Sequence, residues 1–248
     1  MLKLLQCEFI KLKRSRFLMI GILGTLIVPF FVITRSVINC VAKPGTAISL
    51  FTLYDNAIMF LMLLFAPMVL TILSAWVITR EYTDGTLKNI FVIPVSRTAF
   101  LTGKLLFSAI LAFLFMLISW LEILVLALLC GIFLPVTELT LPSCLFFLMR
   151  MLLGGLFLCA TQTPFLFLAV RTRSFMAPLI AIAAVSLVNV VLSNSPIAGF
   201  YPWSASYLLV AGRLSGLGCP RGVSLAVIAV MCIWGIAASA VHFRKEVF

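Results

Sequence analysis

Six long stretches of this sequence are apolar and nearly free of charged side chains, and they constrain the fold more than any other feature. A helix needs roughly 20 apolar residues to cross the hydrocarbon core of a bilayer, which is about 30 Å thick. Inside that core only helices and closed barrels satisfy every backbone polar group, and runs of this length are typical of helices. The sequence therefore predicts an all-α, polytopic membrane protein with transmembrane helices at about 17–34, 57–79, 105–129, 145–170, 175–192 and 223–241.

The composition supports a lipid environment. Of the 248 residues, 64% are hydrophobic and 10% are charged, whereas soluble domains are about 45 to 50% apolar and about 25% charged. These values exclude a water-soluble enzyme, a disulfide-framed secreted domain and a disordered tail. Because the connections between the apolar runs are short, we predict one transmembrane domain over residues 1–248.

The basic residues predict the orientation of the chain. The net charge is +11, and membrane proteins concentrate Lys and Arg in their cytoplasmic segments. With six spans both termini share one side of the membrane, and most of the 18 Lys and Arg residues lie in the segments on that side. We therefore predict that both termini are cytoplasmic, in a multi-pass protein of the cell membrane.

The N-terminal segment 1–16 has an amphipathic pattern. Such a segment is typical of a helix that lies on the membrane interface, although a merely basic flank of the first span fits these residues equally well. The apolar run that follows continues through Pro29 without a small-residue cleavage site, so we expect it to stay as a span. On a helical wheel the apolar side carries Leu2, Leu5, Phe9 and Leu12, and the basic side carries Lys3, Lys11 and Arg14.

Ionisable side chains inside the spans are few. A charged group at such depth costs a few kcal/mol, so it normally finds a partner inside the protein. Glu122 in the third span and Arg150 in the fourth are the natural pair, and Ser119 shares the face of Glu122. In the fourth span, Thr161 and Gln162 begin a polar cluster that ends at a proline and can satisfy the carbonyl groups that the proline frees. These five residues form either a polar path within the membrane or ordinary helix-packing contacts. For each residue taken singly we favour helix packing.

Residues 80–89 form the longest polar stretch on the predicted cytoplasmic side, within a segment that continues to residue 104. Its second half is too apolar for a solvated linker, so we expect it to pack against the membrane face or against another protein. The string Glu81-Tyr82-x-x-Gly85-Thr86-Leu87-Lys88, followed by Pro94-x-Ser96-Arg97 and Gly103-Lys104-Leu105, resembles the cytoplasmic loop of ABC-type-2 permeases. The N-terminal pattern Leu2-x-x-Leu5-x-x-Glu8-Phe9-x-Lys11-Leu12 resembles the start of the same proteins. The closest similarity is to permeases of bacitracin and lantibiotic resistance and immunity systems.

The resemblance implies that segment 80–104 forms a coupling helix seated in a groove of a separate ATPase subunit. Glu81 and Lys88 would then make polar contacts, Gly85 would allow a close turn and Leu87 would be an apolar anchor. The alternative is that Gly85 is simply a turn residue and that Glu81 pairs with Arg80 or Lys88 in solvent. A second cytoplasmic contact could involve Arg171 and Arg173, although arginines at the end of a span are more often plain anchors. The implied coupling residues are Glu81, Tyr82, Gly85, Thr86, Leu87 and Lys88.

The resemblance also implies a complete transporter: two ATPase subunits, which bind ATP and Mg²⁺, and a second permease chain, the same or homologous. It further implies a partly re-entrant outer segment at 193–221 and export or membrane clearance of an amphiphilic cargo such as an antimicrobial peptide. Another cargo (a drug, lipid or glycan) stays an alternative. A secondary transporter driven by an ion gradient is less favoured, because such proteins show more acidic residues at mid-membrane or internal repeats.

The sequence lacks the motifs of an enzyme. No GxxxxGK[ST] phosphate loop occurs, and Gly103-Lys104 lacks both the earlier glycine and the following Ser or Thr. His242 is the single histidine, and the seven cysteines show no CxxC spacing. We therefore expect no metal site and no cofactor on this chain, with ATP hydrolysis on the partner subunit.

Overall fold

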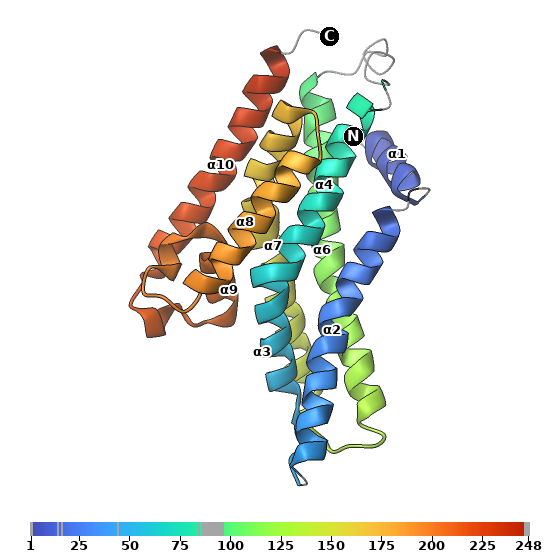
Figure 1. The fold of residues 1–248 in the computed structure, drawn as a ribbon, viewed down its shortest axis with the longest axis vertical. Helices are drawn as coiled ribbons and strands as arrows, with labels where there is room; N and C mark the ends of the chain where they lie inside the picture. Colours follow the sequence, from blue (N-terminus) through green and yellow to red (C-terminus); the bar gives the residue numbers. More distant parts are fainter. Residues whose placement is uncertain are drawn as a thin grey trace.

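The structure, a computed structural model, describes residues 2–245 apart from 14, 16, 44, 84 and 86–96. The described chain is a bundle of long helices (Figure 1) joined by short loops, together with one pair of two-residue strands. In chain order the elements are α1 (Leu2–Lys13), α2 (Phe17–Ala42), β1 (Ile48–Ser49), α3 (Leu50–Phe60), η1 (Leu61–Phe65), α4 (Ala66–Thr83), α6 (Arg97–Cys130), β2 (Val136–Thr137), α7 (Leu141–Thr172), α8 (Met176–Leu192), η2 (Ala198–Phe200), α9 (Pro202–Ala211), η3 (Leu214–Leu217) and α10 (Arg221–Lys245).

Five helical stretches of the described chain are long and apolar enough to cross a membrane, namely Met19–Ala42, Leu50–Thr83, Ala99–Cys130, Leu141–Thr172 and Arg221–Phe243. This confirms the prediction of an all-α protein with several spans. The sixth predicted span corresponds to α8, an apolar helix of 17 residues. At about 1.5 Å per residue it is about 25 Å long, which is shorter than the hydrocarbon core. A sixth complete crossing therefore stays a prediction.

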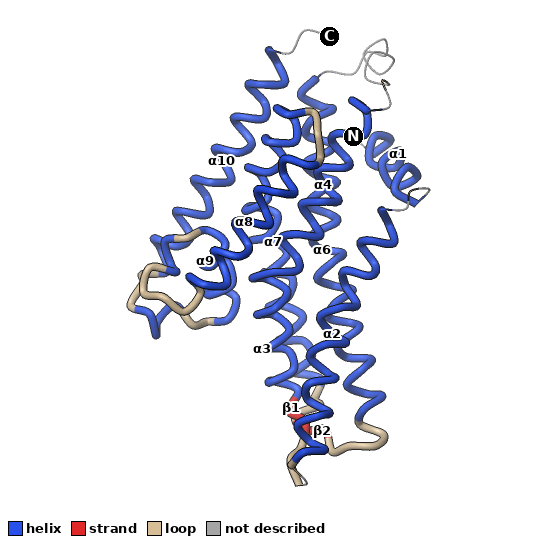
Figure 2. Tube along the Cα trace, in the orientation of Figure 1, coloured by secondary structure: helices blue, strands red, loops and turns tan. Residues whose placement is uncertain are grey.

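The long helices run up and down the bundle. In Figure 1, α1 and the C-terminal end of α10 lie at the same end of the bundle. At the opposite end, β1 pairs with β2 in parallel, with Ile48 opposite Val136 (Figure 2). This arrangement agrees with termini on one side of a membrane, and their cytoplasmic location stays a prediction.

The second span is longer than predicted and contains a π-helical turn. It begins at Leu50, where Ser49 caps the helix by accepting a hydrogen bond from the Thr52 amide, and the turn η1 widens it at Leu61–Phe65. Asn189 on α8 donates from Nδ2 to the Leu63 carbonyl at 3.0 Å, and the Ser204 hydroxyl of α9 donates to Asn189 Oδ1 at 2.7 Å. The π turn has an altered hydrogen-bond pattern, and the Leu63 carbonyl within it accepts from Asn189. Through Asn189 and Ser204, α8 and α9 are held against the second span.

The segment between α8 and α10 forms the short helices η2, α9 and η3. Its helix α9 contacts α7 and α10, and in Figure 1 it lies well short of the end of the bundle that carries β1. Trp203 and Tyr207 on α9 are buried. The segment is folded onto the bundle, and its re-entrant position in a bilayer stays a prediction.

The helices α7 and α10 approach each other closely at a proline. Pro164 lies inside α7 and cannot donate to the carbonyl of Ala160. The Thr163 hydroxyl donates to that carbonyl instead, at 2.9 Å, which is the local repair expected for this cluster. Gly235 of α10 faces the same point: a Cβ there would lie 2.6 Å from the Thr163 carbonyl carbon and 2.8 Å from the Pro164 nitrogen.

This close approach gives the first prediction. Gly235→Ala should destabilise the protein by about 1 to 3 kcal/mol, because the added methyl group meets main-chain atoms that cannot yield without moving a helix. The measurement is the unfolding midpoint of purified protein in detergent. Gly222→Ala is the matched control on the same helix, since a Cβ at Gly222 meets open space. Equal midpoints for the two variants would contradict the close packing of α7 and α10.

Candidate coupling site and buried polar groups

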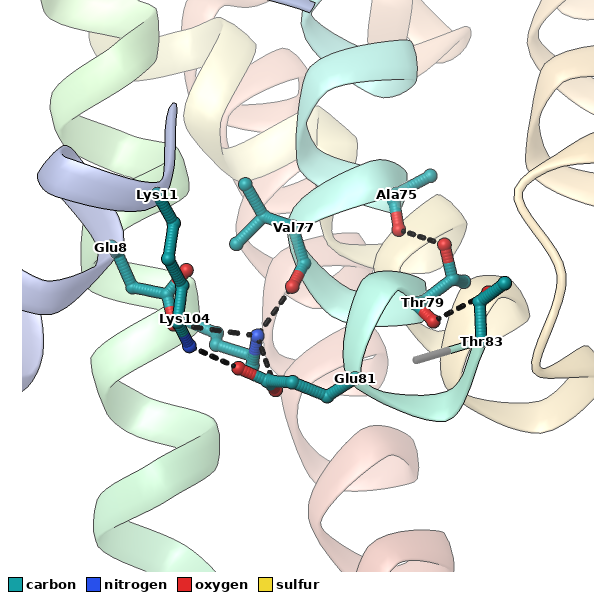
Figure 3. Close-up of polar contacts among 8 residues, drawn as sticks. All are labelled: Glu8, Lys11, Ala75, Val77, Thr79, Glu81, Thr83 and Lys104. Carbon is teal, nitrogen blue, oxygen red and sulfur yellow. Dashed lines mark hydrogen bonds and ion pairs between the residues drawn. The ribbon is translucent and has the colours of Figure 1, made fainter. Parts of the chain in front are cut away.

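A cluster of four charged side chains joins three helices at the end of the bundle that carries α1 (Figure 3). Lys11 Nζ of α1 lies 2.8 Å from Glu81 Oε1 of α4, and Lys104 Nζ of α6 lies 2.7 Å from Glu81 Oε2. Glu8 of α1 completes the cluster, with its Oε1 at 3.5 Å from Lys11 Nζ and 3.6 Å from Lys104 Nζ. We call this group the charge cluster. It ties α1, α4 and α6 together through ion pairs.

The centre of the charge cluster is buried. Glu81 is 3% exposed and Lys104 is 2% exposed, and Lys104 Nζ also donates to the Val77 carbonyl. Removing a charge from water is costly, so such a pair is stable only when each charge keeps partners. Here two lysines balance two carboxylates, and Glu81 lies between the two ammonium groups. The loss of one member would leave an uncompensated buried charge.

The pKa of Lys11 reflects the same balance. Burial lowers the pKa of its ammonium group, but the hydrogen bond and charge of Glu81, together with Glu8, raise it, and the net pKa is raised. A raised pKa in the folded state means that the stabilising contribution is fully present below the unfolded-state pKa and is lost as the pH rises through the folded-state value. The Lys11 pairs therefore stabilise the protein at neutral pH and weaken only under strongly alkaline conditions.

Apolar contacts hold α1 in the same place. Leu12 is buried in the main core and Leu5 packs against it, while the ring of Phe9 meets Phe107 edge to face with 4.9 Å between centroids. Arg80 Nη1 donates to the Lys11 carbonyl at 3.2 Å. Residues 2–13 are thus a helix seated on the bundle, and its position on a membrane interface stays a prediction.

The structure places the predicted coupling residues as follows. Glu81 is buried in the charge cluster, so the alternative of pairing in solvent does not fit its surroundings, and its contact with the ATPase stays a prediction. Tyr82 is half-buried, with the Arg173 guanidinium 5.6 Å from the centre of its ring. Gly85 is exposed, with φ of 63°, a left-handed conformation that suits the expected turn. Thr86, Leu87 and Lys88 lie outside the described residues.

The sequence prediction missed the true partners of Glu81, although the signal was present. Glu8 and Lys11 belong to the N-terminal motif, and Lys104 belongs to the Gly-Lys-Leu motif. Three separate motifs therefore meet in one cluster. Arg171 is exposed at the end of α7, and Arg173 ends that helix in a left-handed conformation with φ of 53°, close to Tyr82.

The predicted pair between Glu122 and Arg150 is wrong. Arg150 Nη1 lies 2.7 Å from Asp55 Oδ1 of α3, and Arg150 Nε donates to the Val210 carbonyl of α9 at 2.9 Å. The guanidinium also lies beside the ring of Phe147, 5.6 Å from its centre. The physical reason is the early start of the second span, which places Asp55 on a helix facing α7 instead of in a loop.

Glu122 has a different partner. The Thr25 hydroxyl of α2 donates to Glu122 Oε1 at 3.0 Å, whereas the Ser119 hydroxyl has no hydrogen-bond partner among the described residues. Thr161 donates to the Phe157 carbonyl of its own helix at 3.0 Å, and Gln162 Oε1 accepts from Ser74 of α4 at 3.4 Å. The hydrogen bonds of the described chain do not join these side chains into one polar path.

No group of three His, Cys, Asp or Glu in the described part of the chain is placed to hold a metal ion. The seven cysteines are all free.

These features define a multi-pass helical membrane protein whose N-terminal helix is ion-paired to Glu81 of α4 and Lys104 of α6. The family model of the ABC-2 family transporter protein matches residues 4–192. This is more than half of the chain, and the chain therefore belongs to the ABC-2 transporter family. It is 25% identical over 202 residues to the bacitracin transport permease protein BCRB of Bacillus licheniformis, a match that covers 82% of this chain and 95% of the relative.

The family establishes the class of the protein and confirms the resemblance that the motifs indicated. The chain is a permease subunit of an ABC transporter, and its ATPase partner is a separate subunit. All four members of the charge cluster lie inside the matched region.

The second prediction concerns the buried carboxylate of the charge cluster. Glu81→Gln should lower the free energy of unfolding by about 3 kcal/mol, because it leaves two lysines beside one remaining carboxylate. The double variant Glu81→Gln with Lys104→Met should recover part of the loss, since it removes a positive charge along with the negative one. Chemical unfolding in detergent measures both. Glu138→Gln, at an exposed position, is the control, and a double variant as unstable as the sum of its single changes would contradict the pairing.

The third prediction distinguishes the two partners proposed for Arg150. In a double-mutant cycle, Arg150→Met and Asp55→Asn should show a coupling free energy of about 1 kcal/mol, because the pair is in contact. The cycle of Arg150→Met with Glu122→Gln should be additive. Unfolding midpoints of the single and double variants provide the measurement, and the reverse pattern would restore the pair between Arg150 and Glu122.

Proposed function

We propose that this chain is the permease of an exporter that removes an amphiphilic cargo, such as an antimicrobial peptide of the bacitracin or lantibiotic type, from the cell or its membrane. Two findings support the proposal: membership of the ABC-2 family, and similarity over most of both chains to a protein named for bacitracin transport. Hydrolysis of ATP on the separate subunit would supply the energy. A drug, lipid or glycan is the alternative cargo.

The observation that carries the mechanism is the charge cluster. The helix α4 ends at Thr83 and α6 begins at Arg97, so segment 84–96 connects two helices that Glu81 and Lys104 already hold together. A force applied to this segment would reach both helices at once, because the ion pair resists their separation. Lys11 and Glu8 extend the same connection to α1.

Within this mechanism the coupling residues divide into two groups. Tyr82, Gly85, Thr86, Leu87 and Lys88 are the candidates for direct contact with the ATPase, with Arg173 beside Tyr82 as part of the same surface. Glu81 acts instead from inside, as the residue that positions α4 against α1 and α6. This assignment changes the role of Glu81 while keeping it in the coupling region.

The proposed complex contains two ATPase subunits and a second permease chain, the same or homologous. ATP and Mg²⁺ would bind to the ATPase subunits, with no cofactor on this chain. We place the complex in a bacterial cell membrane with the charge cluster on the cytoplasmic side, in agreement with the concentration of Lys and Arg at that end. Membership of the ABC-2 family favours ATP-driven transport over the ion-gradient alternative.

The fourth prediction tests the contact with the ATPase. When the permease is purified from its native membranes in mild detergent, an ATPase should be present in stoichiometric amount. Leu87→Asp should reduce its recovery at least tenfold, because a charge would replace the proposed apolar anchor. Leu139→Asp changes an exposed leucine two residues after β2; it is the matched control and should leave recovery unchanged. Full recovery with Leu87→Asp would contradict the assignment.

Transport itself is tested in cells. Expression of the permease with its ATPase should raise the concentration of bacitracin or a lantibiotic that inhibits growth severalfold, and Leu87→Asp should abolish the increase. Protection against neither peptide would contradict this choice of cargo.

A further inference from the structure

An apolar groove lies at the side of the bundle, where α1 crosses α2 and α6. It has a volume of about 340 Å³, which falls at the low end of the roughly 300 to 1,000 Å³ that ligand sites occupy. Its floor is buried, whereas Ile22 and Ile118 on its two walls are 48% and 41% exposed. The groove therefore opens at the surface of two membrane-spanning helices. Its lining is Phe9, Ile10, Leu12, Lys13, Gly21, Ile22, Thr25, Leu73, Leu111, Leu114, Phe115 and Ile118.

The length of the groove matches part of one leaflet. On α6 its lining runs from Leu111 to Ile118, which is about 10 Å at 1.5 Å per residue. One half of a hydrocarbon core about 30 Å thick is about 15 Å deep. The helix α1 covers the groove at the end of the bundle where α2 and α6 begin. The groove therefore runs from a membrane interface toward the middle of the bilayer.

The polar groups of the groove are confined to its two ends. Lys13, which is exposed, stands at the α1 end. At the deep end the Thr25 hydroxyl lies 3.0 Å from Glu122 Oε1 and 2.8 Å from the Ile22 carbonyl oxygen, so its single proton already has acceptors within the protein. Among the described lining residues, an occupant thus meets the cation of Lys13 at the α1 end and an otherwise apolar wall between Lys13 and Thr25.

This pattern selects the chemistry of the occupant. An extended peptide would bring backbone polar groups that an apolar wall leaves without partners, at a cost of several kcal/mol each. A helical peptide satisfies these groups itself, but at about 10 to 12 Å across it is too wide for a groove of about 340 Å³. A second copy of this chain has few acidic side chains with which to balance Lys13, because the sequence holds 7 Asp and Glu against 18 Lys and Arg. A lipid provides both required features, since a basic residue at the membrane interface attracts an anionic headgroup and the acyl chain follows the apolar wall.

We propose that this groove binds one acyl chain of an anionic phospholipid from the leaflet that carries α1, with the lipid phosphate at Lys13. The bound acyl chain fills the space between α1, α2 and α6. Two of these helices, α1 and α6, are also connected by the charge cluster. This lipid site is not the binding site of the cargo, and the proposal does not depend on which cargo the transporter moves.

The test uses the purified full-length chain in vesicles of phosphatidylcholine containing phosphatidylglycerol that carries a photoactivatable group in one acyl chain. After illumination, mass spectrometry locates the labelled residues. Labelling should be at least fivefold greater at residues 21–25 and 111–118 than on equally apolar, exposed faces of α8 and α10, represented by Ile180 and Ile233. Labelling in proportion to exposure on all three faces would mean contact with bulk lipid only and would overturn the proposal.

Two variants test the two parts of the site. Lys13→Gln should reduce labelling of the groove at least threefold, while Lys43→Gln, at an exposed lysine beyond the other end of α2, should not. Gly21→Leu should block the groove, and unfolding midpoints show whether that variant is folded. If it is not, Lys13→Gln alone decides. Undiminished labelling of the groove in Lys13→Gln would overturn the proposal. Cross-links that place a second chain over the groove would also overturn it, because that chain would shield the groove from lipid.

Discussion

The ion pairs of Glu81 with Lys11 and Lys104 are the interaction on which the proposed mechanism depends. Each lysine comes from a different helix, and both contacts are shorter than 3 Å. The four members of the charge cluster are buried or half-buried in an apolar bundle. They are stable only as a group, because removing an unpaired charge from water is costly. The consequence is geometric: α1, α4 and α6 are held together where the proposed coupling segment begins and ends.

The other polar contacts fasten the far half of the bundle in a similar way. Arg150 joins α7 to α3 and α9 through Asp55 and the Val210 carbonyl. Asn189 joins α8 to the π turn of the second span. Each contact uses a side chain whose polar atoms would be costly to leave unpaired in lipid, so each specifies which helices are neighbours. Apolar packing alone specifies neighbours less strictly, because lipid tails are as apolar as the side chains.

The helical membrane fold could be predicted because a run of 20 apolar residues is a strong and local signal. The neighbours of each helix could not, because periodicity does not say which helix faces which. The sequence offers Arg150 as the natural partner of Glu122, and Asp55 lies in a loop if the second span begins at the expected Ala57 and not at Leu50. The π turn at Leu61–Phe65 has no local signature in its five apolar residues. Glu81 shows the same limit, because nothing local connects its motif to the two other motifs that hold its partners.

The most direct test of the central claim is the number of cargo molecules moved per ATP hydrolysed by the reconstituted transporter. If the charge cluster transmits force from the ATPase, Glu81→Gln in an assembled complex should leave ATP hydrolysis within about twofold of the wild type while cargo movement per ATP falls at least tenfold. The exposed-site variant Glu138→Gln should leave the ratio unchanged. An assembled Glu81→Gln complex that moves as much cargo per ATP as the wild type would contradict the claim.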